Sequence, residues 1–162
     1  MQQTEPADLL SILSGAGDAE KDALPKIVDD ARERDGAELR VTRFLGETAS
    51  GRYWVGVDER GEICVFAEQK LSQHVSINCQ SLQRFRLDGA SAGGSGSYKD
   101  EEGNYRTDHT ELFVVPDGYA PVEIPEGLEL IQPNVLAGEG TGGDHWVSFR
   151  SEGTGRQIKI PR

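Results

Sequence analysis

Apolar and polar residues alternate along most of this chain from residue 38 onward, which is the pattern of β-strands with one buried face. Residues 52–57 and 62–67 are rich in aromatic and β-branched side chains, and the turn sequence 58–61 between them ends in glycine. The sequence therefore predicts an antiparallel hairpin there. Further strands are predicted at residues 39–45, 76–79, 85–87, 111–115, 122–124, 128–131, 134–136, 145–149 and 157–160.

Residues 1–37 are rich in acids and contain no aromatic side chain. Asp8 is expected to cap a short helix that carries a cluster of aliphatic residues, Leu9, Leu10, Ile12 and Leu13. A second helix is predicted over residues 22–34, with Pro25 in its first turn and Gly36 as its stop. We expect this region to pack on an edge of the sheet, and a docking arm or tether is the alternative.

These elements predict a mainly β (α+β) fold. We expect an antiparallel sandwich or open barrel of short strands at residues 38–162, preceded by a helical N-terminal arm at residues 1–37. The composition agrees, because 20 glycines and 7 prolines among 162 residues suit a loop-rich β protein better than a helical bundle. Two glycine-rich segments, residues 89–96 and 137–143, are predicted to be flexible loops.

The chain is strongly acidic, with a net charge of −11 from 28 acidic and 17 basic residues. Such a surface repels phosphate backbones, so nucleic acid is not an expected partner. The best candidate for a basic patch, formed by Arg84, Arg86 and Lys99, is interpreted as ordinary surface charge. No apolar run is long enough to span a bilayer, so this segment is not expected to insert into a membrane. If the protein is exported, we expect a signal or anchor to precede residue 1.

Neither a metal site nor another cofactor site is predicted. The three histidines (His74, His109 and His145) and two cysteines lack the close spacing of zinc ligands. Residues 100–104 resemble a calcium loop, but the glycine falls at the fourth position and no glutamate closes the loop. We interpret this segment as an acidic turn.

Nucleophilic catalysis is not predicted either. Residues 93–97, with the sequence GGSGS, lack the last glycine of the Gly-x-Ser-x-Gly motif, and a serine in a flexible loop is poorly held for attack. Asp108 and His109 are adjacent, as are Asp144 and His145, so each pair points to opposite faces of a strand. The aromatic residues in strand patterns are expected in the core rather than on a carbohydrate-binding face: Tyr53, Trp54, Phe66, Phe113, Trp146 and Phe149.

The two cysteines carry most of the information about compartment. Cys64 lies within the predicted hairpin and Cys79 follows it, both among β-type residues and without redox or metal spacing. A disulfide is the favoured interpretation, and two reduced buried thiols are the alternative. A bridge of this span adds roughly 3 kcal/mol of stability in the chain-entropy model, and it implies export.

One family resemblance is carried by short motifs. Residues 53–66 (YWVGVDERGEICVF), the later Cys79, the stretch 112–118 (LFVVPDG) and the preceding RFLG at 43–46 resemble a recurring extracellular module of actinobacterial membrane proteins and lipoproteins. The resemblance covers residues 38–136. It implies a secreted or tethered domain with one disulfide, and it implies no catalytic residue.

The sequence thus predicts a non-enzymatic exported or membrane-tethered domain with an interaction or structural role. It would act in the extracellular space or on the outer face of the cell membrane, with an unidentified protein or cell-envelope partner. The alternative is a small hydrolase or carbohydrate-binding protein of the cell envelope that uses Asp108, His109 or His145 in a cleft. A cytosolic regulatory protein with free thiols is a third possibility.

Overall fold

The structure is a computed structural model that describes residues 4–26, 28, 38–140 and 146–162. Within these residues, the helical elements with described bounds are α1 (Pro6–Leu9), η1 (Ser11–Leu13) and, among the strands, α3 (Leu82–Asp88). The strands are β1 (Leu39–Glu47), β2 (Gly51–Asp58), β3 (Ile63–Gln69), β4 (Val75–Gln80), β5 (Ala90–Lys99), β6 (Tyr105–Val114), β7 (Tyr119–Pro121), β8 (Leu128–Gln132), β9 (Val135–Gly138), β10 (Trp146–Ser151) and β11 (Gln157–Pro161).

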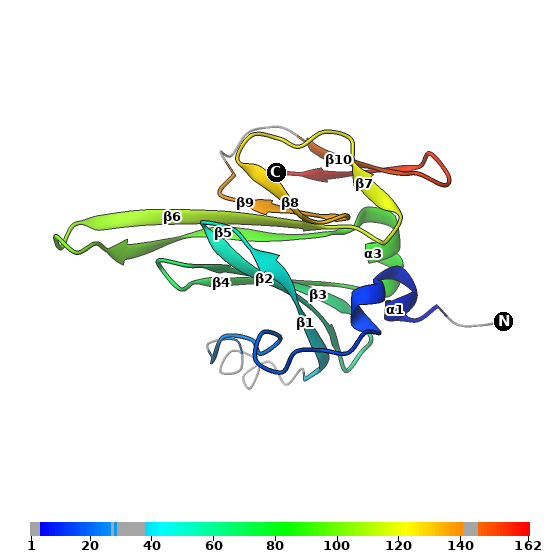
Figure 1. The fold of residues 1–162 in the computed structure, drawn as a ribbon, viewed down its shortest axis with the longest axis horizontal. Coiled ribbons are helices and arrows are strands. Elements are labelled where there is room, and N and C mark those ends of the chain that lie inside the picture. The colour runs from blue at the N-terminus through cyan, green and yellow to red at the C-terminus, as the bar shows by residue number, and fades with distance from the viewer. Residues whose placement is uncertain (1–3, 27, 29–37, 141–145) are drawn as a thin grey trace.

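The strands form three open sheets that stack on one another (Figure 1). The first sheet has the order β1-β2-β3-β4, the middle sheet β5-β6-β9-β8, and the outer sheet β11-β10-β7. Every strand pair is antiparallel. The prediction of a mainly β, antiparallel, open architecture with a short N-terminal helix is therefore confirmed.

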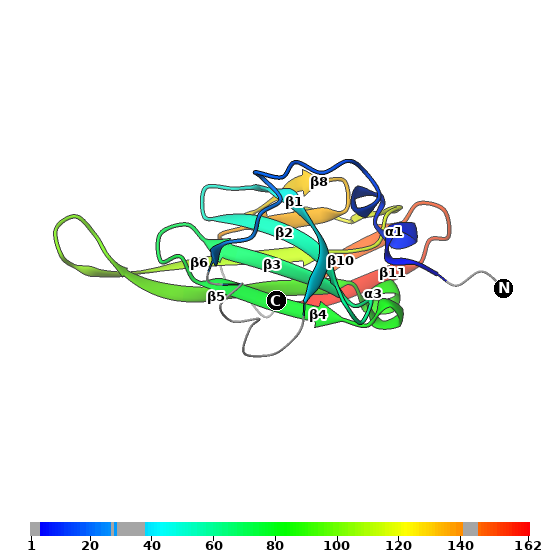
Figure 2. The ribbon, with the colours of Figure 1, turned by 90° about the horizontal axis from the view of Figure 1, so that it is seen from below.

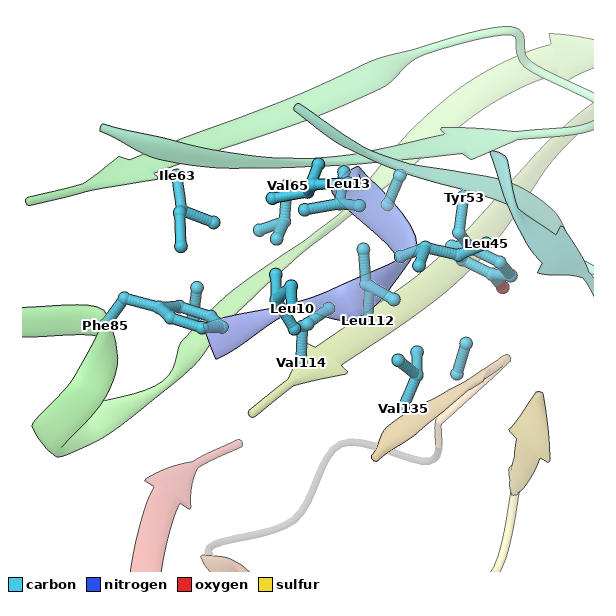
Figure 3. Packing of buried hydrophobic residues seen from close by; sticks show 14 of the residues in the cluster. Leu10, Leu13, Leu45, Tyr53, Ile63, Val65, Phe85, Leu112, Val114 and Val135 are labelled. Carbon is cyan, nitrogen blue, oxygen red and sulfur yellow. The ribbon is translucent and has the colours of Figure 1, made fainter. Parts of the chain in front are cut away.

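The main core lies between the first and middle sheets (Figure 3). Because side chains alternate between the faces of a strand, Tyr53 and Val55 of β2 point into this core while Trp54 points away from it. Leu112 and Val114 of β6 approach from the middle sheet. A second core joins the opposite face of the middle sheet to the outer sheet and includes Phe113, Leu136, Val147, Phe149, Ile158 and Ile160. The middle sheet is thus covered on both faces.

The N-terminal segment is packed against the sheets. Leu10 and Leu13 are buried in the main core. Farther along, the backbone carbonyl of Lys21 accepts a hydrogen bond from the Trp54 indole at 2.9 Å, and the Asp22 carboxylate accepts one from the Phe44 amide at 2.7 Å. These contacts lie on the outer face of the first sheet. Most of the predicted helix at 22–34 lies outside the described residues, and Asp8 occupies the third helical position instead of the N-cap, which is Glu5.

The predicted strand at residues 85–87 is wrong, because these residues belong to helix α3. The Ser81 side chain caps the helix by accepting the Arg84 amide at 3.2 Å, and Gly89 ends it with a φ of 66°. Phe85 alone is buried on this helix and anchors it in the main core. One apolar anchor between polar neighbours does not distinguish a helical turn from a short strand.

The predicted flexible loop at residues 89–96 is also wrong, because residues 90–96 lie in strand β5, which pairs with β6 over ten residues. The glycines of β5 have no side chain, and this allows the neighbouring β3–β4 hairpin to pack closely against the strand. A Cβ on Gly94 would lie 3.0 Å from the Ser76 hydroxyl, and a Cβ on Gly96 would lie 2.6 Å from the Cβ of Ser72. The β3–β4 hairpin therefore approaches β5 more closely than a strand with larger side chains would allow.

The remaining predictions differ less from the structure. Residues 122–124 are not in a strand: β7 ends at Pro121, although the Val122 amide still donates to Ser148 before the chain leaves the sheet. Part of the predicted loop at 137–143 belongs to β9, and residues 141–143 lie outside the described part. The other predicted strands overlap strands of the structure. Within the described residues, no helix has the length and apolar character needed to cross a membrane.

Candidate functional site

The two cysteines sit directly opposite each other on β3 and β4. Their sulfur atoms are 2.07 Å apart, a bonded distance, and their Cα atoms are 4.0 Å apart. Cys64 is buried beside Trp54 and Phe66 on the outer face of the first sheet. The bridge therefore ties the edge strand β4 to its neighbour β3 covalently, at the register that the backbone pairing already defines.

Two carboxylates lie close to this bridge. Asp58 ends β2, and its carboxylate accepts hydrogen bonds from the amides of Arg60 and Glu62, both at 2.9 Å. Burial raises the pKa of the Glu62 carboxyl, and the charge of Asp58 raises it further. Within the described residues, Asp58, Cys64 and Cys79 form a group close enough to hold a metal ion. Both sulfur atoms are consumed by the bridge, so this group has no thiolate to offer.

A second constellation, which we call the Ser–His–Glu–Arg cluster, lies on the middle sheet and comprises Ser95, His109, Glu111 and Arg162. Ser95 of β5 pairs directly with His109 of β6, and Glu111 follows two residues later on the same face. The Ser95 hydroxyl lies 2.9 Å from His109 Nδ1, and His109 Nε2 lies 3.4 Å from a Glu111 carboxylate oxygen. Arg162, after β11, donates from Nε to the other Glu111 oxygen at 3.2 Å.

The protonation pattern of the His109 ring follows from its two partners. An ionised Glu111 carboxylate can only accept hydrogen bonds, so in the neutral ring Nε2 carries the proton. Nδ1 then has a free lone pair and accepts the proton of the Ser95 hydroxyl. A hydroxyl, an imidazole and a carboxylate aligned in this way form the chain of groups that activates a serine for nucleophilic attack.

A shallow hollow of about 240 Å³ lies beside the cluster. Its lining is made of small or apolar residues of β5 and β6, together with His109, Glu111 and the C-terminal residues Pro161 and Arg162. The His109 side chain is 34% exposed, whereas the side chains of Glu111 and Arg162 are only 11% and 4% exposed. Nη2 of Arg162 is buried and has no hydrogen-bond partner among the described residues. The cluster therefore has an accessible end at Ser95 and His109 and a buried, charged end.

Asp108 does not join the cluster, because it points to the opposite face of β6. Its carboxylate accepts hydrogen bonds from the amides of Leu71 at 3.0 Å and Ser72 at 3.1 Å, which fixes the β3–β4 turn. Burial by itself raises the pKa of Asp108, but the hydrogen bonds from Ser72 and Leu71 outweigh burial and hold the pKa below its usual value. Asp108 is therefore a structural acceptor, as expected for adjacent residues that point to opposite faces.

The other candidates stay apart from the cluster. His145 lies outside the described residues, and His74 lies next to β4, where its ring faces Gly96. The Asp100 carboxylate is held by Arg106 and by the amides of Glu102 and Asn104, so the predicted acidic turn is confirmed.

The three cations considered as a basic patch are separated in space. Arg84 and Arg86 lie on α3, and Arg84 pairs with Asp88 at 3.3 Å. Lys99 lies at the far tip of the β5–β6 hairpin, 5.1 Å from the centre of the Tyr105 ring (Figure 1). Their arrangement supplies no continuous positive surface.

Five of the six aromatic residues predicted for the core are buried there. Trp146 is the exception, with 59% of its surface exposed on the outer face of the outer sheet. A stacking platform for a sugar built from the whole set is therefore excluded, since buried rings cannot meet a ligand.

Ser95 is the serine of the GGSGS segment that was weighed as a nucleophile and rejected, because that segment was interpreted as a flexible loop. The useful signal was register: once β5 and β6 are paired, a serine on one strand lies opposite a histidine on the other. Comparisons of this chain with protein-family models, curated proteins and solved structures find no match.

Proposed function

We propose that this chain is an exported or membrane-tethered domain of the cell envelope whose main role is to bind a partner on the outside of the cell. The observation that carries the proposal is the bond between Cys64 and Cys79. Disulfides form and persist in oxidising compartments and are rare in the reducing cytosol. The resemblance to extracellular modules of actinobacterial membrane proteins and lipoproteins supports the same location.

The shape of the domain supports a binding role. The β5–β6 hairpin projects well beyond the other strands, at the end of the molecule opposite α3 (Figures 1 and 2). Near its tip, Tyr105 is 76% exposed and Lys99 lies over its ring. A tyrosine combines a large contact area with few rotatable bonds, which makes it a frequent anchor residue in interfaces. We propose that the partner, a protein or another envelope component, contacts this projecting tip.

The compartment is tested in the cells that produce the protein. An antibody against the folded domain is used to follow it through cell fractionation, and intact cells are treated with an added protease. The proposal expects the domain in the medium or on the cell surface, with both cysteines resistant to alkylation until a reductant is added. Recovery from the cytosol with two alkylatable thiols would refute it.

The binding role is tested with a photo-crosslinking amino acid placed at Tyr105 of the full protein. Thr154, in the exposed turn between β10 and β11, is the matched control position. The proposal expects a crosslinked product on cells from position 105 and none from position 154. Equal products from both positions, or none from either, would contradict a contact through the hairpin tip.

A further inference from the structure

We infer that Ser95 is a nucleophilic serine, activated by His109, that attacks small carboxylic esters. This activity goes beyond the binding role proposed above and does not depend on it. It corresponds to the hydrolase alternative that the sequence left open, but its nucleophile is the serine of residues 93–97 that was rejected from the sequence alone. The inference rests on the Ser–His–Glu–Arg cluster and on the hollow beside it.

The geometry of the cluster fits a nucleophilic serine. A nucleophilic serine needs a base within hydrogen-bond reach and a third group that orients the base. His109 Nδ1 lies 2.9 Å from the Ser95 hydroxyl, and the Glu111 carboxylate lies 3.4 Å from Nε2. The second distance is long, as is common for catalytic hydrogen bonds in the absence of substrate. Each of these residues is placed by regular pairing between β5 and β6, so the cluster does not depend on a loop.

At the buried end of the cluster, the Arg162 side chain is 4% exposed and pairs with Glu111. Its Nη2 has no hydrogen-bond partner within the part of the chain that the structure describes. Leaving a buried charged donor unpaired is costly, so such a group calls for an explanation, of which a role in catalysis is one. Among the described residues that line the hollow, Arg162 is the one cation. Through its hydrogen bond to Glu111 it holds the carboxylate that orients His109.

The lining and the volume of the hollow indicate which class of ester it accepts. Ala92, Gly93, Gly94 and Phe113 contribute to a lining that is largely small or apolar, and its volume is about 240 Å³. Such a space accepts a short, uncharged acyl group. Because the hollow is shallow and Ser95 is exposed, the alcohol part of the ester can extend into solvent. A net charge of −11 further favours neutral esters over anionic ones.

The reaction uses only the cluster, the ester and water. The Ser95 oxygen forms a bond to the ester carbonyl carbon while its proton passes to His109 Nδ1. The bond between that carbon and the alcohol oxygen then breaks, and the departing alcohol takes the proton from Nδ1. Water attacks the resulting acyl-serine with the same base, which releases the carboxylic acid and restores the serine hydroxyl.

Labelling with a fluorophosphonate probe tests the nucleophile directly. Intact mass and peptide mapping of the full chain should show one adduct, located on Ser95. Ser95→Ala and His109→Ala should each abolish the adduct. Ser97→Ala is the matched control, because Ser97 is exposed on the same face of the same strand, and it should label like the wild type. Absence of an adduct, or an adduct that persists in Ser95→Ala, would overturn the inference.

Hydrolysis of p-nitrophenyl acetate provides the second measurement. General-base catalysis typically contributes a factor of about 100 or more, so the wild type should exceed both Ser95→Ala and His109→Ala by about that factor. Glu111→Gln should lower kcat by a larger factor than it changes KM, because the main role of Glu111 is to orient the base. Equal rates for wild type and Ser95→Ala would refute the activity, and that outcome leaves the crosslinking and fractionation results unaffected.

Discussion

Substitution of Gly96 by alanine tests the close contact between β5 and the β3–β4 hairpin. A Cβ at this position would lie 2.6 Å from the Cβ of Ser72 and would also overlap the Ser72 hydroxyl and the His74 ring. Carbon atoms pack at about 3.5–4.0 Å, so the hairpin and β5 would have to separate by roughly 1 Å. Overpacking of this kind costs typically 1–3 kcal/mol.

One smaller effect partly offsets that cost. Alanine reduces the conformational freedom of the unfolded chain relative to glycine by about 0.4–1 kcal/mol. The net expectation for Gly96→Ala is therefore a loss of about 1–2 kcal/mol in the free energy of unfolding. For a chain of 162 residues this corresponds to a decrease in Tm of roughly 2–8 °C.

The assay is urea unfolding followed by tryptophan fluorescence, with thermal unfolding as a second measurement. Gly153→Ala is the matched control, because no atom lies within 4 Å of a Cβ at Gly153. That variant should be as stable as the wild type or slightly more stable. Equal stability of Gly96→Ala and Gly153→Ala would show that residues 89–96 do not pack as described.

Three further predictions concern the bridge and the titrating carboxylates. Replacing Cys64 and Cys79 together by alanine should lower the free energy of unfolding by about 3 kcal/mol. Wild-type protein unfolded in a reductant should show a similar loss. Equal stability of the oxidised and reduced protein would contradict this prediction. Since the pKa of Glu62 is raised in the folded state, its contribution to stability is present at low pH and lost as pH rises through that pKa. Glu62→Gln should therefore stabilise the protein by about 0.5 kcal/mol at pH 7. Urea titrations should show that this gain disappears below about pH 4. A gain that does not depend on pH would count against repulsion between Glu62 and Asp58. The pKa of Asp108 is lowered instead, so its contribution is present at neutral pH and lost as pH falls below about 4. Asp108→Asn should cost about 1 kcal/mol at pH 7 and less in acid, and a constant difference across pH would refute this role.

The first sheet could be predicted from sequence because its chemistry is local. The β2–β3 hairpin combines alternating apolar residues with a turn that ends in Gly61, and Cys79 then falls opposite Cys64 once β4 is paired. Each of these signals depends on a few neighbouring residues. They favour the same antiparallel arrangement, so the prediction did not require knowledge of distant contacts.

The middle sheet was harder to predict because its signals are tertiary. Glycines of β5 look like a flexible loop until the β3–β4 hairpin is placed against Gly94 and Gly96. Helix α3 buries only Phe85 fully, with Leu82 partly buried beside the core, so two apolar positions are too few to show a helical period in the sequence. The Ser–His–Glu–Arg cluster depends on strand register and on Arg162 meeting Glu111 across 51 residues of chain, neither of which composition or spacing reveals.

The state of the two cysteines in protein taken from its natural location tests the account most directly. Material from the medium or cell surface is treated with an alkylating agent without a reductant, and its intact mass is measured. The account predicts a mass two hydrogens below that of the reduced chain, no alkylation, and a single cross-linked peptide pair that joins Cys64 to Cys79. Recovery of the protein with two alkylated thiols would contradict both the bridge and the proposed location.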